Sequence, residues 1–203
     1  MESSFKQKIR EIKYFLPGII GIGFLVMIVI NGARTYYNGK VELENSHNEM
    51  INNINKDLQI LLSEEVRNME VASELLLNDK EVLQLFSWQD RGMLADHLLP
   101  IYQSKLKPEF GVKQFQFHLP PATSFLRLHK VQKFGDDLSS FRKTVIGAND
   151  KVKIVSGLEV GVGGLGVRLV HPVMFEGKHI GSMEFGTDFN EILISIAKKN
   201  NVS

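Results

Sequence analysis

Residues 156–186, SGLEVGVGGLGVRLVHPVMFEGKHIGSMEFG, decide the fold of this chain. Within and around them, three runs rich in apolar and β-branched residues, 153–160, 165–175 and 179–187, are separated by the glycine-bearing connections GVGG and EGK. Short connections of this composition join antiparallel neighbours in hairpins. The stretch therefore predicts a three-stranded antiparallel meander.

Two further strands are predicted before the meander. Apolar and polar residues alternate in VKQFQFHL, residues 112–119, with the two-residue period of a half-buried strand. Pro120 and Pro121 end that strand, because neither residue can donate a hydrogen bond to a sheet. Residues 125–129 alternate again, and residues 138–148 have the pattern of a short helix. The fold class is therefore α+β, with a PAS-like five-stranded antiparallel sheet and flanking helices.

The N-terminal part of the chain contains a membrane helix by length and composition. Residues 14–33, YFLPGIIGIGFLVMIVINGA, are uncharged, and as a helix they span roughly 30 Å, the thickness of a bilayer's hydrocarbon core. The run is longer than the roughly 7 to 15 apolar residues of a signal peptide, and no A-x-A site follows it. We therefore expect an uncleaved anchor. Four basic residues precede the run: Lys6, Lys8, Arg10 and Lys13.

Because lysine and arginine residues next to a membrane helix stay on the cytoplasmic side, residues 1–13 are expected in the cytoplasm. The remainder is then periplasmic or extracellular, held at the inner (cell) membrane. Residues 34–78 form a long amphipathic helix in this interpretation, residues 79–190 the PAS-like sensor domain, and residues 191–203 a final helix that leads toward a second membrane helix.

An apolar stripe with steps of three and four residues predicts the long helix. At about 45 residues the helix is roughly 70 Å long, so its membrane-proximal half needs a partner other than the small sheet domain. We expect that partner to be a second copy of the chain, with a possible interruption of the helix at Gly39. The stripe consists of Ile51, Ile54, Leu58, Leu62, Val66, Met69, Ala72 and Leu76.

Composition excludes several functional classes. The 203 residues carry a net charge of +1, which indicates neither nucleic acid nor a strongly acidic partner. Cysteine is absent, so disulfides, thiolate metal sites, c-type haem and a catalytic thiol are excluded. No cofactor is expected.

Residues 118–149, HLPPATSFLRLHKVQKFGDDLSSFRKTVIGAN, together with the meander, resemble the extracytoplasmic Cache sensor domains of bacterial chemoreceptors and related transmembrane signalling proteins. The sequence is most similar to the double Cache type 3 group, although only one PAS-like module is visible. The resemblance implies a ligand-sensing module in chemotaxis or signal transduction, paired as a homodimer. A HAMP domain and an output domain are missing from the sequence, so a methyl-accepting, kinase or cyclase output stays open.

Arg127 and His129 are the first candidate ligand contacts, because they lie two residues apart on one face of the short strand. A guanidinium fork matches a carboxylate, and an imidazole beside it supplies a further donor. The pair suits a small organic anion such as acetate, propionate or pyruvate. The alternative is that Arg127 pairs with a nearby carboxylate such as Asp136. His118, on the polar face of the preceding strand, is a further candidate.

Glu159, Arg168 and Glu184 lie at the centres of the three meander strands, among glycines that mark a close approach by a ligand or another backbone. Either Arg168 and Glu184 form a cross-strand salt bridge, or these charges contact the ligand. Arg142, on the helix before the meander, either lies on a solvated face or closes the pocket.

Metal and enzyme functions are not expected. Nothing in the spacing of His118, His129, His171 and His179 makes these side chains converge, as a metal site requires. The neighbouring Asp136 and Asp137 are explained by helix capping rather than by catalysis. A ligand-free structural module for dimerisation is the alternative function, and a filled core without a pocket would favour it.

Overall fold

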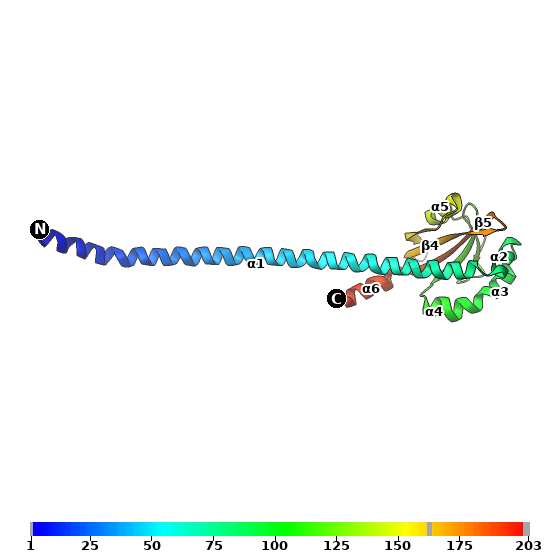
Figure 1. Cartoon of the computed structure of the whole chain (residues 1–203), viewed down its shortest axis with the longest axis horizontal. Coiled ribbons are helices and arrows are strands. Elements are labelled where there is room, and N and C mark those ends of the chain that lie inside the picture. The colour runs from blue at the N-terminus through cyan, green and yellow to red at the C-terminus, as the bar shows by residue number, and fades with distance from the viewer. Residues whose placement is uncertain (1, 162–163, 201–203) are drawn as a thin grey trace. The chain divides into compact units, whose positions relative to one another are not determined.

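The computed structural model describes residues 2–161 and 164–200, so Val162 and Gly163 of the predicted GVGG turn and the last three residues lie outside the described part. The chain divides into two compact units, Met1–Asn53 and Ile54–Ser203. Helix α1 (Glu2–Leu77) belongs to both (Figure 1). By length and composition, α1 is the one helix of the described residues that could cross a membrane.

The expected interruption of the long helix at Gly39 is wrong, because α1 continues through this residue and through Pro17. A glycine inside a helix costs only about 1 kcal/mol relative to alanine. Helix formation is cooperative, so one such residue does not end a helix with many good helix formers on either side.

The second unit contains a sheet and short helices. Trp88, Gln89 and Asp90 separate the two helices that follow α1. The elements are α2 (Lys80–Ser87), α3 (Arg91–Ile101), the π-helical turn η1 (Tyr102–Leu106), α4 (Lys107–Glu109), β1 (Gln114–Leu119), β2 (Thr123–Arg127), α5 (Lys143–Lys151), β3 (Val155–Gly161), β4 (Gly164–Phe175), β5 (Lys178–Asp188) and α6 (Phe189–Lys199).

The five strands form one antiparallel sheet in the order β2-β1-β5-β4-β3. The predicted α+β fold with a C-terminal meander is therefore confirmed. The expected final helix is also present, and the Asp188 side chain caps it by accepting a hydrogen bond from the Asn190 backbone.

Two details differ from the expectation. Strand β2 ends at Arg127, so His129 lies in the following turn and does not share the strand with Arg127. Helix α5 begins at Lys143, so Arg142 is the residue that precedes it. The chain before α5 pairs with the start of β2 instead of forming helix, because Asp137 bridges to Thr123 and the Leu138 N–H donates to the carbonyl of Ala122, the residue before β2.

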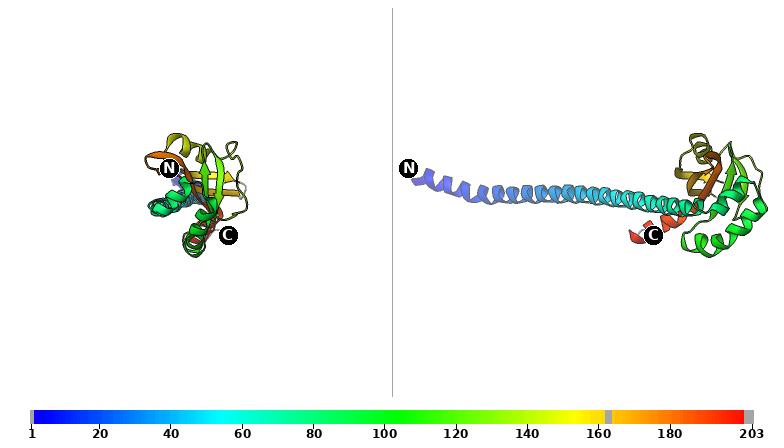
Figure 2. Two further views of the ribbon diagram at one scale, coloured as in Figure 1. Left: turned by 90° about the vertical axis from the view of Figure 1, so that its right-hand side faces the viewer. Right: turned by 45° about the vertical axis from the view of Figure 1, so that its right-hand side comes forward.

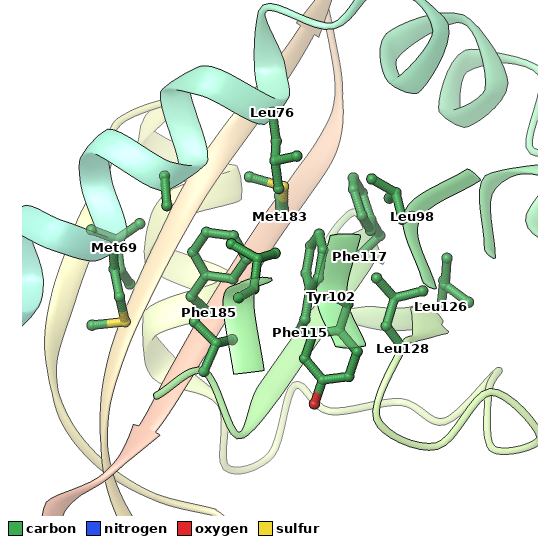
Figure 3. Close-up of a cluster of buried hydrophobic side chains, with 14 of the residues drawn as sticks. Met69, Leu76, Leu98, Tyr102, Phe115, Phe117, Leu126, Leu128, Met183 and Phe185 are labelled. Atoms are coloured by element: carbon green, nitrogen blue, oxygen red, sulfur yellow. The ribbon is translucent and has the colours of Figure 1, made fainter. Parts of the chain in front are cut away.

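The main core lies between one face of the sheet and the helices α1, α2 and α3 (Figure 2). Phe115 and Phe117 of β1, Phe185 of β5, and Met69 and Leu76 of α1 all belong to this core (Figure 3). The ring centroids of Phe115 and Phe185 are 4.8 Å apart, a usual separation for interacting aromatic pairs.

The opposite face of the sheet carries a second, smaller apolar cluster under α5, formed by Ala122, Leu138, Val145, Ala148 and Val170. Side chains alternate between faces along a strand, so the residues between the core phenylalanines of β1 point to this side. This is the face that carries the polar residues singled out from the sequence.

Candidate ligand-binding site

Buried charges gather on the sheet face that α5 and residues 128–142 cover. Strand β1 contributes His118, β4 contributes Arg168 and β5 contributes Glu184, and all three side chains are almost completely buried. Charged groups are rarely buried without partners, because their transfer out of water is costly. Their partners therefore show what the site can do.

Arg142 joins two strands through their carboxylates. Its Nε donates to Glu159 Oε2 at 2.7 Å, and its Nη2 donates to Glu184 Oε1 at 2.5 Å. Glu159 also accepts hydrogen bonds from the backbone and hydroxyl of Thr144. Burial opposes the ionisation of Glu159, but the bonds from Thr144 and Arg142 outweigh it and lower its pKa. Arg142 is thus buried and engaged, and not on a solvated face.

Arg168 has the fewest partners of the three arginines at this site. Its side chain lies against glycines, with Nη2 only 3.2 Å from the position that a Cβ on Gly161 would occupy. Its Nε and Nη1 are buried and have no hydrogen-bond partner among the described residues. Burial lowers its pKa. The Arg168 Nη1 to Glu184 Oε1 distance is 3.7 Å, which is an ion pair but not a hydrogen bond.

His118 lies beside Glu184 and is also under-partnered. Its Nε2 is 3.4 Å from Glu184 Oε2, and neither ring nitrogen has a hydrogen bond among the described residues. Burial, followed by the positive charges of Arg142 and Arg127, lowers the pKa of His118 to about 3. The imidazole is therefore neutral at pH 7.

Two serines extend this row of unpaired polar atoms across the sheet. Ser124 of β2 and Ser182 of β5 are the cross-strand neighbours of His118, and both hydroxyls are buried without a hydrogen bond among the described residues. An unpaired buried polar group costs about 1 to 3 kcal/mol, so water or a ligand is needed here.

Arg127 uses all three guanidinium nitrogens within the protein. Nε donates to Gln116 Oε1 at 3.1 Å, Nη1 to the Lys133 carbonyl at 2.9 Å, and Nη2 to Asp136 Oδ2 at 3.0 Å. The hydrogen bond from Arg127 lowers the pKa of Asp136. Of the two roles considered from the sequence, the pairing of Arg127 with Asp136 is the arrangement present.

A pocket of about 280 Å³ lies beside this cluster, between strands β1 and β2 and residues 129–142. Five cationic side chains and one carboxylate line it. His129 also lines the pocket, and burial lowers its pKa. The charged lining residues are Lys113, Arg127, Lys130, Lys133, Arg142 and Asp136.

Three further residues that line this pocket were not predicted from the sequence: Gln116, Lys130 and Lys133. Gln116 alternates with Phe115 and Phe117 and is two residues from His118, so strand periodicity placed it on the site's face. The two lysines lie in a turn without a periodic pattern, so no local signal indicated them.

A larger groove of about 640 Å³ lies between α1, residues 107–113 and α6, and none of the seven predicted site residues lines it. His171 is outside the pocket as well, with Nδ1 2.9 Å from the Ser73 hydroxyl on α1. Among residues 2–161 and 164–200, no group of three or more His, Cys, Asp or Glu side chains is arranged to hold a metal ion.

Comparison with known families gives a match over most of the chain. Residues 44–202 match the model of the dCache_3 family, described as the double sensory domain of two-component sensor kinase. No curated protein matches this chain closely enough to be counted.

Two solved domains have the same fold. The sensor domain of the histidine kinase DctB from V. cholerae is 13% identical with a TM-score of 0.56, and the match covers 73% of this chain and 57% of that domain. An extracellular domain described as that of a histidine kinase, vpHK1S-Z8, is 16% identical with a TM-score of 0.55, and the match covers 76% and 63%. This chain therefore spans less than two thirds of either domain.

Proposed function

Because the chain belongs to the dCache_3 family of double sensory domains, we propose that it is the extracytoplasmic ligand-sensing module of a bacterial transmembrane receptor. Its ligand is a small organic anion, a short carboxylate such as acetate, propionate or pyruvate. Its output is chemotaxis or another form of signal transduction.

The charge of the pocket carries this proposal. Five cationic side chains against one carboxylate line a small cavity, and the buried Arg168 with free Nε and Nη1 lies in the adjoining cluster. A guanidinium with free donors binds a carboxylate in a planar, two-point arrangement. A buried cation without a hydrogen-bonded counterion is costly, and an anionic ligand removes that cost.

The proposed roles follow from which donors are free. Arg168 binds the carboxylate, with Arg142 beside it and His118 and His129 as further donors. Glu159 and Glu184 hold Arg142 in place through the hydrogen bonds at 2.7 and 2.5 Å. Arg127 forms the pocket wall, and it contacts the ligand directly only if Asp136 is displaced.

The module is proposed to be anchored by residues 14–33, with residues 1–13 in the cytoplasm and residues 34–78 as the helix leading to the sensor domain. Residues 79–190 form that domain, and residues 191–203 lead out of it. Two copies pair through the membrane-proximal part of α1, because the apolar stripe from Ile54 to Leu76 already packs on the core of the same chain.

The signal is a helix displacement. Ligand binding orders the segment after β2 and shifts β5 and α6. Helix α6 contacts α1 through Asp57, whose carboxylate accepts hydrogen bonds from Lys199 Nζ at 2.6 Å and Asn200 Nδ2 at 3.3 Å. A ligand moves this equilibrium only by the difference between its affinities for the two states.

A thermal-shift screen of the full chain in detergent tests the proposal. A carboxylate present at 100 times its dissociation constant stabilises the protein by about 2.7 kcal/mol. Arg168→Met, which keeps an unbranched stem but removes the guanidinium, should weaken binding about 30-fold or more, because it removes a charged hydrogen-bonded contact. Arg67→Ala, at an exposed arginine of α1, is the matched control. Equal affinity of Arg168→Met and the wild type would contradict the proposed site.

A ligand-free structural module for dimerisation is the second candidate. The observation in its favour is that Arg127 and Arg142 already have carboxylate partners within the protein. It predicts a folded dimer whose unfolding temperature is unchanged by every carboxylate, amino acid and amine in the screen.

A further inference from the structure

One wall of the pocket is an irregular segment, residues 130–137, which contributes Lys130, Lys133 and Asp136 to the lining. We call this segment the rim. Its C-terminal end is joined to β2, because the Gly135 N–H donates to the Ser124 carbonyl and the Ser124 N–H to the Asp136 carbonyl. The first half of the rim has no such ladder among the described residues.

Two arginine side chains from different elements hold that first half. Arg127 donates to the Lys133 carbonyl from the pocket side. Arg91, the first residue of α3, donates through Nη1 to the Val131 carbonyl at 3.1 Å. The Arg91 guanidinium carbon also lies 3.6 Å from the centroid of the Phe134 ring, which is a cation–π contact.

Arg91 does not line the pocket. Any effect of Arg91 on a ligand must therefore pass through the rim. A single guanidinium holds both Val131 and Phe134, three residues apart, so it fixes the turn between them as well as its distance from α3. A lysine ammonium, as a point charge, cannot reproduce the planar hydrogen bond and the stacking together.

We infer that Arg91 is a positioning residue of the binding site, which holds the rim in place over the pocket from α3. The inference deepens the proposed function and rests on it for the effect on ligand binding. The hydrogen bond and the exposed cation–π contact together should shift the equilibrium between the observed rim and a rim detached from α3 by about tenfold.

Hydrogen exchange of the full chain in detergent tests the positioning role without a ligand. In the structure, the Lys133 amide donates a hydrogen bond to the Lys130 carbonyl at 2.9 Å, and the Gly135 amide donates to the Ser124 carbonyl at 2.7 Å. In Arg91→Ala, both should exchange about tenfold faster, whereas the amides of β5 keep their rates. Arg67→Ala is again the matched control. Unchanged exchange of the rim would overturn the inference.

A second variant covers the case in which Arg91→Ala loses the fold and the β5 amides also exchange faster. Phe134→Leu removes only the ring under the guanidinium, at a half-exposed position. It should accelerate exchange of the rim by a smaller factor and leave β5 unchanged. No acceleration in Phe134→Leu would then overturn the inference.

Titration with pyruvate as the probe separates the inference from the proposed function. A loss of about tenfold in affinity in Arg91→Ala, together with faster rim exchange, supports both. Faster rim exchange with unchanged pyruvate affinity overturns the role of Arg91 in binding. If the wild type binds neither pyruvate nor any other small carboxylate, the proposed function fails, while the exchange result still decides whether Arg91 positions the rim.

Discussion

At Gly186 the sheet has no room for a side chain, because the Arg168 guanidinium lies against that backbone. Arg168 and Gly186 are cross-strand partners of β4 and β5, so the absent Cβ is what lets the long side chain lie flat on the sheet. The glycine thus sets the position of the arginine proposed to bind the ligand.

We predict that Gly186→Ala displaces Arg168 and lowers the free energy of unfolding by about 1 to 3 kcal/mol, the usual effect of overpacking. Gly147→Ala in α5 is the control, because its Cβ would meet Val155 at an ordinary 3.7 Å. Urea denaturation measures both. A Gly186→Ala protein as stable as the wild type would show that the Arg168 side chain has an alternative conformation that accommodates the added methyl group.

His118 supports a prediction on pH. Its folded-state pKa of about 3 is below the ordinary value of 6.5, so the unfolded chain binds a proton that the folded protein does not. Stability should therefore rise with pH and fall as the pH drops below about 6.5, by up to about 1.4 kcal/mol per pH unit. Burial lowers the pKa of His129 and His171 as well, and both add to the same trend.

His118→Asn should reduce the slope of stability against pH between about pH 6.5 and pH 5, before the carboxylates titrate. The urea midpoint at several pH values gives that slope. His47→Asn, at an exposed histidine of α1, is the control. An unchanged slope in His118→Asn would mean that His118 is hydrated in the folded protein.

Among the elements, α6 is attached to α1 by polar contacts from its last turn. The Asp57 carboxylate accepts hydrogen bonds from the side chains of Lys199 and Asn200, and the bond from Lys199 lowers the pKa of Asp57. Apolar contact adds to this, because Ile192 and Ile196 belong to the main core. The polar contact therefore fixes only the C-terminal end of α6, whereas apolar packing on the core holds the rest of the helix.

Asp57→Ala should increase amide exchange in the last turn of α6 and leave β5 unchanged. The physical reason is that an ion pair with one exposed partner, here Lys199, stabilises locally and weakly, so its loss frays a helix end without unfolding the domain. Asp96→Ala on α3 serves as the control at an exposed carboxylate. Faster exchange throughout the sheet would instead make Asp57 part of the cooperative core.

For the whole molecule, the membrane-proximal part of α1 predicts a homodimer, because the stripe from Ile54 onward packs on the core of its own chain and leaves Ile51 exposed. The chain has no cysteine, so a single introduced cysteine reports directly on the pairing. Ile51→Cys, at an exposed position of the stripe, should form an intermolecular disulfide in the full chain. Asn52→Cys, about a quarter turn away, should cross-link less. Equal cross-linking at both positions, or none at high protein concentration, would contradict the dimer.

Local patterns determined most of the fold. The two-residue period and the glycine-bearing turns specified the strands of the meander, and the uncharged run at residues 14–33 specified a helix long enough for a membrane. These signals are local, since periodicity reports which face of an element is buried. The same local reasoning failed at Gly39, where the cooperativity of the whole helix outweighs one residue.

Tertiary structure alone decided which charges meet. From the sequence, Arg127 could bind the ligand or pair with a carboxylate such as Asp136, and Arg168 could bind the ligand or pair with Glu184. In the folded protein, Arg127 pairs with Asp136, and Arg142 lies between Glu159 and Glu184. Arg168 is left with two buried donor nitrogens that have no hydrogen-bond partner among the described residues. The choice depends on cross-strand register and on burial by residues 128–142. Both arise from contacts between segments far apart in the chain, which no local pattern encodes.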